Sequence, residues 1–286
     1  MKNTIISLIF FVLFFDLNIL AQSETNQINV LASKPEVSEK TKNFNNHLNI
    51  ALMSYHEVKE LVQYAIDNYN DKQLWHLAYE IMTSQYYEFH PMLIKARIKH
   101  AKTPTDKAGL QCSYVQSAFL VKWRKSNYNK NDDMQINQKL RDAIYDAVNN
   151  FPSDCQDQKN ILFLIAANQC AMTVAYEHEN DLDKAWGFYK NGRTKIGDPP
   201  YENITEKNVD LNNYLDWTLQ GLAVSLIENK NLINKKTSLK TIQELKKAVK
   251  KLPDSDFEKG QKLECLNILK QYEKEIAEAS VKNKTK

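Results

Sequence analysis

The stretch Ala147–Asp154, AVNNFPSD, recurs in altered form at Ala248–Ser255 as AVKKLPDS. Extended towards the N-terminus, the first copy has Leu, Ile, Ala and Pro at the positions where the second has Thr, Leu, Ala and Pro. Each copy joins a small residue, where two helices can pack closely, to a proline that forces the next helix to begin afresh. The recurrence therefore predicts two helix ends, each followed by a new helix.

A third segment has a similar pattern. Ala185, Tyr189 and Gly192 precede Gly197-Asp198-Pro199, and Tyr176 lies before them. The spacing resembles the second helix of a tetratricopeptide repeat, A-x3-F-x2-A-x4-P, over about three units between Asp132 and Pro253. The chain departs from the family at Leu140 and Thr241, where the family has alanine, and Gly192 replaces another alanine.

The resemblance implies an all-α fold built as a right-handed array of antiparallel helix pairs. It also implies a concave surface that binds a protein partner. It transfers no catalytic residue to this chain.

Helical periodicity extends over most of the chain, and alternating strand patterns are scarce. The sequence predicts helices at 37–69, 71–89, from Pro91 onwards, 105–127, 132–151, 154–178, 181–195, 206–229, 237–251 and 254–280. In the first of these, Leu52 and Tyr55 belong to the apolar stripe. Thr105-Asp106 is predicted to cap one helix, and Ser153-x-x-Gln156 and Ser255-x-x-Glu258 are predicted capping boxes for two others.

The N-terminus indicates export. Lys2 precedes the apolar run Ile5–Phe15, and we expect signal-peptide cleavage after Ala21 or Ser23. The alternative, an uncleaved anchor, is disfavoured because Asp16 and Asn18 interrupt the run. We predict a periplasmic or secreted protein with no stable membrane insertion after cleavage. Its expected organisation is a signal peptide (1–23), a flexible lead (24–36), a single helical repeat domain (37–280) with a possible joint at 197–205, and a disordered tail (281–286).

Charge is unevenly distributed along the chain. The formal net charge is +3, and the segment 230–286 holds 15 Lys against 8 Asp or Glu. Such an end can attract an anionic surface or an acidic protein, or it can form a solvated helix face. No nucleic-acid-binding motif is present, so we predict no nucleic-acid partner.

The four cysteines leave two hypotheses open. Export permits disulfides, and Cys112 with Cys155 is the preferred pair because both lie near the starts of helices expected to point the same way. Cys155 and Cys170 are predicted on one helix, about 22 Å apart, and cannot bond. The alternative is four buried, reduced thiols.

Catalytic motifs are absent. His56 with Glu60 and His76 with Glu80 are each one helical turn apart and could hold a metal, but H-E-x-x-H, G-x-S-x-G, S-x-x-K and glycine-rich phosphate loops do not occur. We therefore predict no catalytic, cofactor-binding or metal-binding residue. A metal-dependent hydrolase that uses the His-rich N-terminal half stays an alternative hypothesis.

Aromatic residues are the most informative candidates for binding. Most would fill gaps between helices, but adjacent Tyr86 and Tyr87 cannot both face inward. The candidate interface residues are Tyr79, Tyr86, Tyr87, Tyr128 and Tyr201. The predicted function is an exported, non-catalytic protein that binds a protein partner, for example a periplasmic inhibitor or immunity protein. The further alternative is a structural component of an envelope complex.

Overall fold

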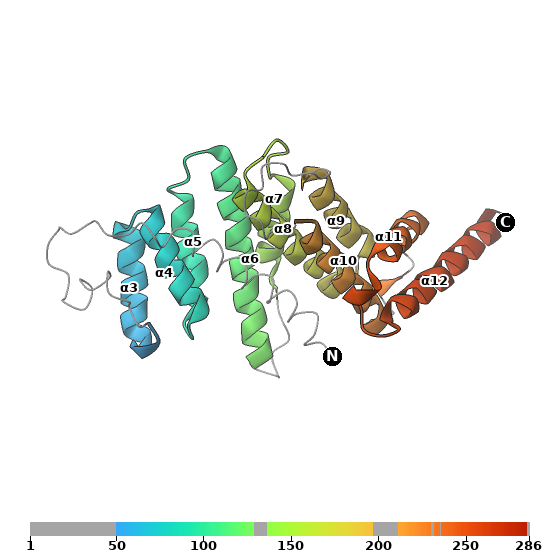
Figure 1. Ribbon diagram of the computed structural model, residues 1–286, viewed down its shortest axis with the longest axis horizontal. Helices are drawn as coiled ribbons and strands as arrows, with labels where there is room; N and C mark the ends of the chain where they lie inside the picture. Colours follow the sequence, from blue (N-terminus) through green and yellow to red (C-terminus); the bar gives the residue numbers. More distant parts are fainter. Residues whose placement is uncertain (1–49, 129–135, 197–210, 230–231, 235, 285–286) are drawn as a thin grey trace.

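The computed structural model describes residues 50–128, 136–196, 211–229, 232–234 and 236–284. These residues form ten α-helices, three short 3-10 turns and one π-helical turn, and they contain no β-strand. The helices follow one another along the longest axis of an elongated molecule (Figure 1). The prediction of an all-α fold is confirmed.

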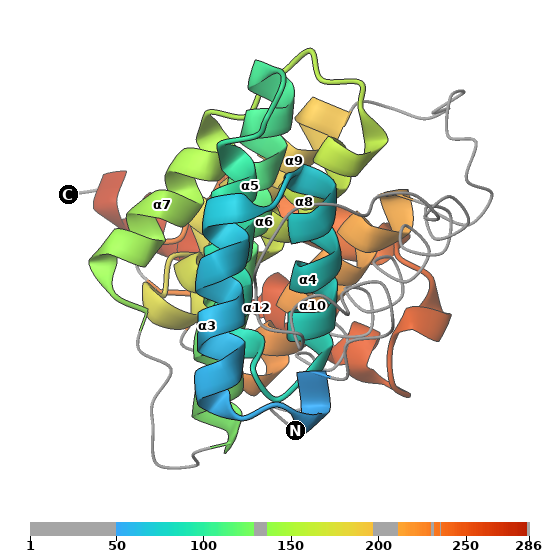
Figure 2. The same cartoon turned by 90° about the vertical axis from the view of Figure 1, so that its left-hand side faces the viewer.

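The first part of the array holds four α-helices and two 3-10 turns. In chain order they are η3 (Ile50–Leu52), α3 (Tyr55–Asn68), α4 (Asp71–Thr83), η4 (Tyr87–Phe89), α5 (His90–Ile98) and α6 (Pro104–Tyr128). Seen from that end, α3 and α4 stand in front with α5 behind them (Figure 2). Ser54 with Glu57 and Asn70 with Gln73 form reciprocal capping boxes, which satisfy exposed backbone N–H groups at the starts of α3 and α4. Pro91 lies in the first turn of α5, as predicted.

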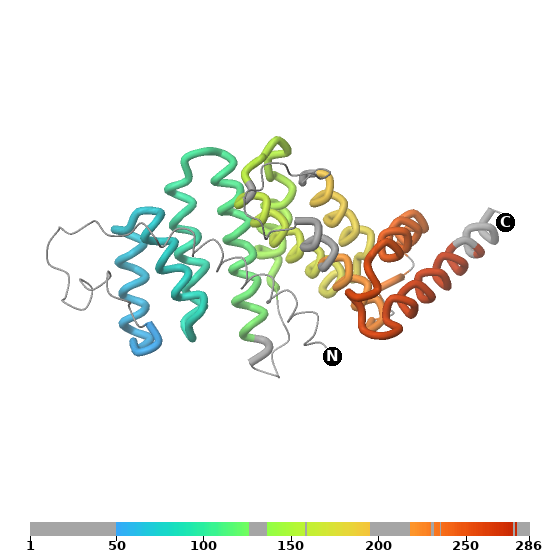
Figure 3. The backbone as a smooth tube through the Cα atoms, viewed as in Figure 1, coloured from blue at the N-terminus to red at the C-terminus, as the bar shows by residue number. Residues whose placement is uncertain are grey.

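The second part continues the array. It consists of α7 (Gln138–Asn149), α8 (Gln158–Thr173), the π-helical turn η5 (Val174–His178), α9 (Leu182–Ile196), α10 (Leu211–Glu228), α11 (Leu239–Lys251), η7 (Asp254–Asp256) and α12 (Gln261–Lys284). The chain can be followed from α3 to α12 in Figure 3. α6 packs against both α7 and α8, and α12 packs against both α10 and α11.

The two recurring stretches are helix ends. α7 ends at Asn149, before Pro152, and α11 ends at Lys251, before Pro253. Cys112 Sγ of α6 donates a hydrogen bond to the Ala147 carbonyl across 3.6 Å, so two helices do approach closely at the small residue of the first copy.

Three predicted caps are wrong. α8 begins at Gln158, where Asp157 caps the backbone N–H of Asn160, so Ser153 and Gln156 lie in the preceding loop. α12 begins at Gln261, because a 3-10 turn and Gly260, with φ of +88°, follow Pro253. α6 is capped by Thr103 instead of Thr105-Asp106, since Thr103 Oγ1 accepts from the Asp106 N–H.

Several helix boundaries also differ from the prediction. α3 starts only at Tyr55, and the helix predicted over 71–89 ends at Thr83. α12 continues to Lys284, into the tail predicted from 281 onwards. The signal peptide, the lead and the joint at 197–205 lie outside the described residues. Within the described part of the chain, none of the helices combines the length and apolar character needed to cross a bilayer.

The described residues hold two hydrophobic cores. One lies among η3, α3, α4 and α5, and the other extends from α6 to α12. Tyr114 of α6 packs against both. Helices α3, α4 and α5 therefore share an interior of their own, and their surface, with the end of α6, positions the candidate site below.

Candidate protein-binding surface

Four chain segments meet at one end of the N-terminal helices: the starts of α3 and α5, and the ends of α4 and α6. Tyr55 at the start of α3 bonds to Glu88 before α5, across 2.8 Å. Arg124 near the end of α6 donates to the Met82 carbonyl at the end of α4, across 3.0 Å. These contacts bring together aromatic and charged side chains that are far apart in the sequence.

Tyr55 is the central exposed residue of this surface. Its ring lies 5.2 Å from that of Phe89 and 6.4 Å from that of Tyr86, between ring centres. Its hydroxyl donates to Glu88 Oε1, and this hydrogen bond raises the pKa of the Tyr55 hydroxyl. Because 53% of Tyr55 stays exposed, much of the ring is available to a partner.

Two exposed apolar residues lie at the same end of the N-terminal helices as Tyr55. Leu52 is 82% exposed in the turn before α3, and Met92 is 44% exposed in the first turn of α5. Leu52, Tyr55 and Met92 are three of the four exposed large apolar residues in the described part of the chain, the fourth being Leu263 of α12. We call Leu52, Tyr55, Tyr87 and Met92 the N-terminal aromatic surface.

The sequence had placed Leu52 and Tyr55 in the apolar stripe of a long helix, which is wrong. Ser54 ends the 3-10 turn and starts α3 as its N-cap, so the helical register is broken between Leu52 and Tyr55. The capping box Ser54–Glu57 was the signal in the sequence that could have revealed this break.

Tyr86 and Tyr87 point in different directions. Tyr86 is buried, and its hydroxyl donates to the Met53 carbonyl. Tyr87 is partly buried, with the Arg124 guanidinium carbon 4.7 Å from its ring centre. Tyr86 therefore supports the surface from within, while Tyr87 contributes to it as half of a cation–π pair.

The charges at this surface are ordered. Lys125 Nζ lies 3.1 Å from Glu88 Oε2, so Glu88 bridges Tyr55 and Lys125. The hydrogen bond from Tyr55, and then the contact with Lys125, lower the pKa of the Glu88 carboxyl. The carboxylate is thus ionised at neutral pH and holds the Tyr55 ring in place.

Beneath the surface, His90 Nδ1 and Ser117 Oγ are 2.5 Å apart between α5 and α6. Burial, and then the nearby Arg124 and Arg97, lower the pKa of the His90 imidazole to about 3. His90 is therefore neutral at physiological pH. Its place between two helices makes this contact a partly buried polar link, since part of the ring's hydrogen bonding is satisfied by Ser117.

The remaining predicted binding residues are Tyr79, Tyr128 and Tyr201, and the side chains of the last two are outside the described part of the structure. Tyr79 is partly buried on α4. Tyr128 is the last residue of α6, and Tyr201 lies outside the described residues.

The structure does not contain the predicted Cys112–Cys155 disulfide, and all four cysteines are buried thiols. Cys112 Sγ contacts the Ala147 carbonyl, whereas Cys155 Sγ contacts the Asp157 carbonyl in the loop before α8. Cys155 was assigned to the start of a helix, and its actual place in a loop changes the direction of its side chain.

Among the described histidines of the N-terminal half, His56 contacts its predicted partner, Glu60. His56 Nε2 lies 3.2 Å from Glu60 Oε1 on the exposed side of α3. Across the described ranges there is no group of three or more His, Cys, Asp or Glu residues that could hold a metal ion.

A second polar cluster lies where α8 ends in its π-helical turn. Lys184 Nζ of α9 is 2.8 Å from Glu179 Oε2 and 3.7 Å from the ring centre of Tyr145 on α7. Asn180 takes the left-handed conformation, with φ of 50°, that commonly ends helices. Because the cluster joins three helices around a helix end, it is best explained as a packing feature.

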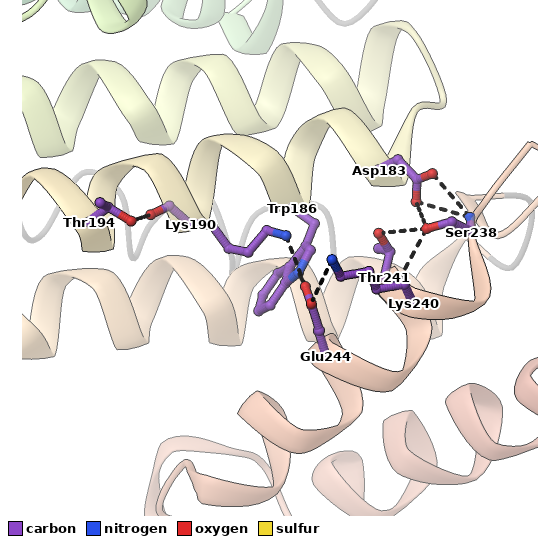
Figure 4. A network of polar contacts seen from close by, with 8 residues as sticks. All are labelled: Asp183, Trp186, Lys190, Thr194, Ser238, Lys240, Thr241 and Glu244. Atoms are coloured by element: carbon purple, nitrogen blue, oxygen red, sulfur yellow. Dashed lines mark hydrogen bonds and ion pairs between the residues drawn. The ribbon is translucent and has the colours of Figure 1, made fainter.

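A third network joins α9 to α11 (Figure 4). Asp183 accepts hydrogen bonds from the backbone N–H and the hydroxyl of Ser238, which is the N-cap of α11. Further along, Glu244 of α11 accepts from Trp186 Nε1 and from Lys190 Nζ of α9. These bonds fix the orientation of α11 on α9.

No family model, no curated protein sequence and no solved structure matches this chain.

Proposed function

We propose that this chain is an exported, non-catalytic protein that binds a protein partner through its N-terminal aromatic surface. The observation that carries the proposal is the exposure of Leu52, Tyr55 and Met92 at one end of a separately packed core. Isolated exposed apolar residues are ordinary, but several at one end of a fold are typical of interfaces.

The residue types favour a protein partner. Tyrosine and arginine are enriched among the residues that dominate binding energy, and they act best when surrounded by apolar contacts that exclude water. Tyr55 is held by Glu88 and Phe89, and Tyr87 is covered by Arg124. Side chains that are already ordered lose less conformational entropy on binding.

The scaffold proposed for this surface is an array of helix pairs resembling tetratricopeptide repeats. The resemblance rests on the recurring Ala and Pro positions and on Ala185, Tyr189 and Gly192. Of these positions, Ala147, Ala185, Tyr189 and Gly192 are buried. A periplasmic or secreted inhibitor or immunity protein fits an exported binding protein that lacks catalytic motifs. N-terminal sequencing of the mature protein tests export, and an intact Met1 would contradict it.

The interface is tested by affinity capture with the mature protein as bait. A partner captured by the wild type should be lost with Leu52→Ser, Tyr55→Ala and Met92→Ser, singly or together. Leu263→Ser is the matched control, because Leu263 is 64% exposed on α12, outside the surface. Equal capture by all variants would refute this surface. Stoichiometric zinc or iron that is lost on His76→Ala would favour the hydrolase hypothesis instead.

A further inference from the structure

α11 has the most positive composition of the described helices. Its sequence, LKTIQELKKAVKK, carries five Lys and one Glu. Ile242, Leu245 and Val249 are fully buried in the larger core. The apolar side of this amphipathic helix is therefore already occupied, and only its polar side can contact a partner.

The lysines of that polar side form one face. Lys240, Lys247, Lys250 and Lys251 are all exposed, at relative positions that share a helix face opposite the buried residues. From Lys240 to Lys251 the face is about 16 Å long at the helical rise of 1.5 Å per residue. We call these four residues the α11 lysine face.

Nearby carboxylates neutralise only part of this face. Glu244 is already bonded to Trp186 and Lys190, and Lys240 reaches it only at 3.9 Å (Figure 4). Glu273 of α12, which packs against α11, is bonded to Lys246 and Gln243. The hydrogen bonds to these two carboxylates lower the pKa of both. Of the lysine face, Lys247, Lys250 and Lys251 form no ion pair within 4.0 Å with any described residue, although the charge of Lys247 also helps to lower the pKa of Glu273.

We propose that the α11 lysine face docks an acidic surface on a protein partner. That the partner is a protein rests on the proposed function. That its surface is acidic rests on the positive charge that the two carboxylates leave on this face. Several carboxylates along about 16 Å of a partner helix or strand would complement the row of lysines.

An anionic membrane fits the face less well. Basic amphipathic helices that bind membranes insert their apolar side between the lipids, but the apolar side of α11 lies in the core. The exposed positions between the lysines are Gln243 and the partly buried Glu244, so no apolar side chain accompanies the lysines on this face.

The test uses a fluorescein-labelled oligoglutamate peptide and fluorescence anisotropy. The variant is the triple substitution Lys247→Gln, Lys250→Gln and Lys251→Gln. The control is Lys72→Gln, Lys95→Gln and Lys107→Gln, which removes the same net charge from three exposed lysines on three other helices. Circular dichroism checks that both variants are folded.

The α11 variant should bind the peptide about tenfold more weakly, and the control should stay within about twofold of the wild type. Binding by the wild type should weaken as NaCl rises from about 50 to about 300 mM, because exposed charges are screened. Equal loss in both variants would overturn the proposal, since net charge alone would then explain binding. Retention of the wild-type affinity by the α11 variant would also overturn it.

Vesicles of phosphatidylcholine and phosphatidylglycerol form the second arm. Binding to vesicles without binding to the peptide would overturn the proposal in favour of a membrane surface. The Tyr55→Ala variant should bind the peptide as the wild type does, because Tyr55 is not on α11. The experiments therefore distinguish a wrong proposal about the lysine face from a wrong proposal about the N-terminal aromatic surface.

Discussion

Gly109 of α6 lies directly against Asn160 of α8. A Cβ atom at Gly109 would stand 2.0 Å from Asn160 Oδ1. Asn160 is buried, and its Nδ2 donates to Asp106 Oδ1 across 3.3 Å while its backbone N–H donates to Asp157. The side-chain amide cannot move away without losing its bond to Asp106, so the two helices pack best at this distance around glycine.

We therefore expect Gly109→Ala to destabilise the protein by about 1–3 kcal/mol through overpacking. The intrinsic preference of alanine for helices, up to about 1 kcal/mol, would offset only part of this. Urea unfolding followed by circular dichroism measures the difference.

Gly187→Ala is the matched control. Gly187 lies within α9, and an added Cβ would meet nothing within 4 Å. This change should stabilise the protein by up to about 1 kcal/mol, since only helix propensity acts. Stabilisation by both alanine variants would show that the contact between Gly109 and Asn160 is not tight.

The buried Arg97 depends on Asp71. Arg97 is 2% exposed, and its Nε and Nη2 donate to the two Asp71 oxygens across 2.7 and 3.2 Å. Its guanidinium also lies 4.8 Å from the ring centre of Trp75. Asp71→Ala would leave a buried cation without its acceptor and remove a favourable charge from the first turn of α4. The expected cost is about 2–3 kcal/mol in chemical denaturation.

Asp67→Ala provides the comparison, because Asp67 is exposed on α3 and bonds only to Gln63 among the contacts described. It should change stability by less than about 0.5 kcal/mol. The double variant Asp71→Ala with Arg97→Met should recover part of the loss. If Asp71→Ala proves as mild as Asp67→Ala, the pair does not stabilise the fold.

His90 should make stability depend on pH. Its pKa is about 3 in the folded protein and near 6.5 in the unfolded chain, so the proton is taken up only on unfolding. The contribution of His90 is fully present above about pH 6.5 and is lost progressively as the pH falls towards 3. With allowance for the accessible part of the ring, we expect a loss of about 1 kcal/mol between pH 7 and pH 5.

Urea titrations of the wild type and of His90→Asn between pH 7 and pH 5 check this expectation. The variant keeps a polar side chain near Ser117 and should show a shallower slope. Some slope should remain, because burial also lowers the pKa of His178. Identical slopes would mean that His90 does not change its proton affinity on folding.

The cysteines should be inert in the native protein. Burial raises the pKa of the Cys265 thiol to about 12 and also raises the pKa values of the Cys155 and Cys170 thiols. Because the thiolate is the reactive form, iodoacetamide at about pH 8 should label none of these three until denaturant is added.

Peptide mapping without reduction checks the same residues. All four thiols should be recovered free, as the structure has them. Recovery of a Cys112–Cys155 cross-linked peptide would contradict the structure and restore the pairing predicted from the sequence.

Several features were predictable because they depend on local chain geometry. Pro152 and Pro253 cannot continue a helix, so the ends of α7 and α11 could be placed from the sequence. The apolar period of 3.6 residues gave the all-α class. The caps of α8 and α12 could not be placed in the same way. A Ser-x-x-Gln or Ser-x-x-Glu pattern does not show how many residues form the turn between the proline and the start of the next helix.

The sequence by itself determined that this protein is helical and where its proline-marked helices end, because backbone dihedral limits act within a few residues. Only the tertiary structure decided that Leu52 and Tyr55 are exposed, that Cys112 and Cys155 do not bond, and that Glu244 is occupied by Trp186 and Lys190. Each of these outcomes depends on which helices pack together and in which register. That choice is made by burial of apolar area over distant segments, and no short stretch of sequence encodes it.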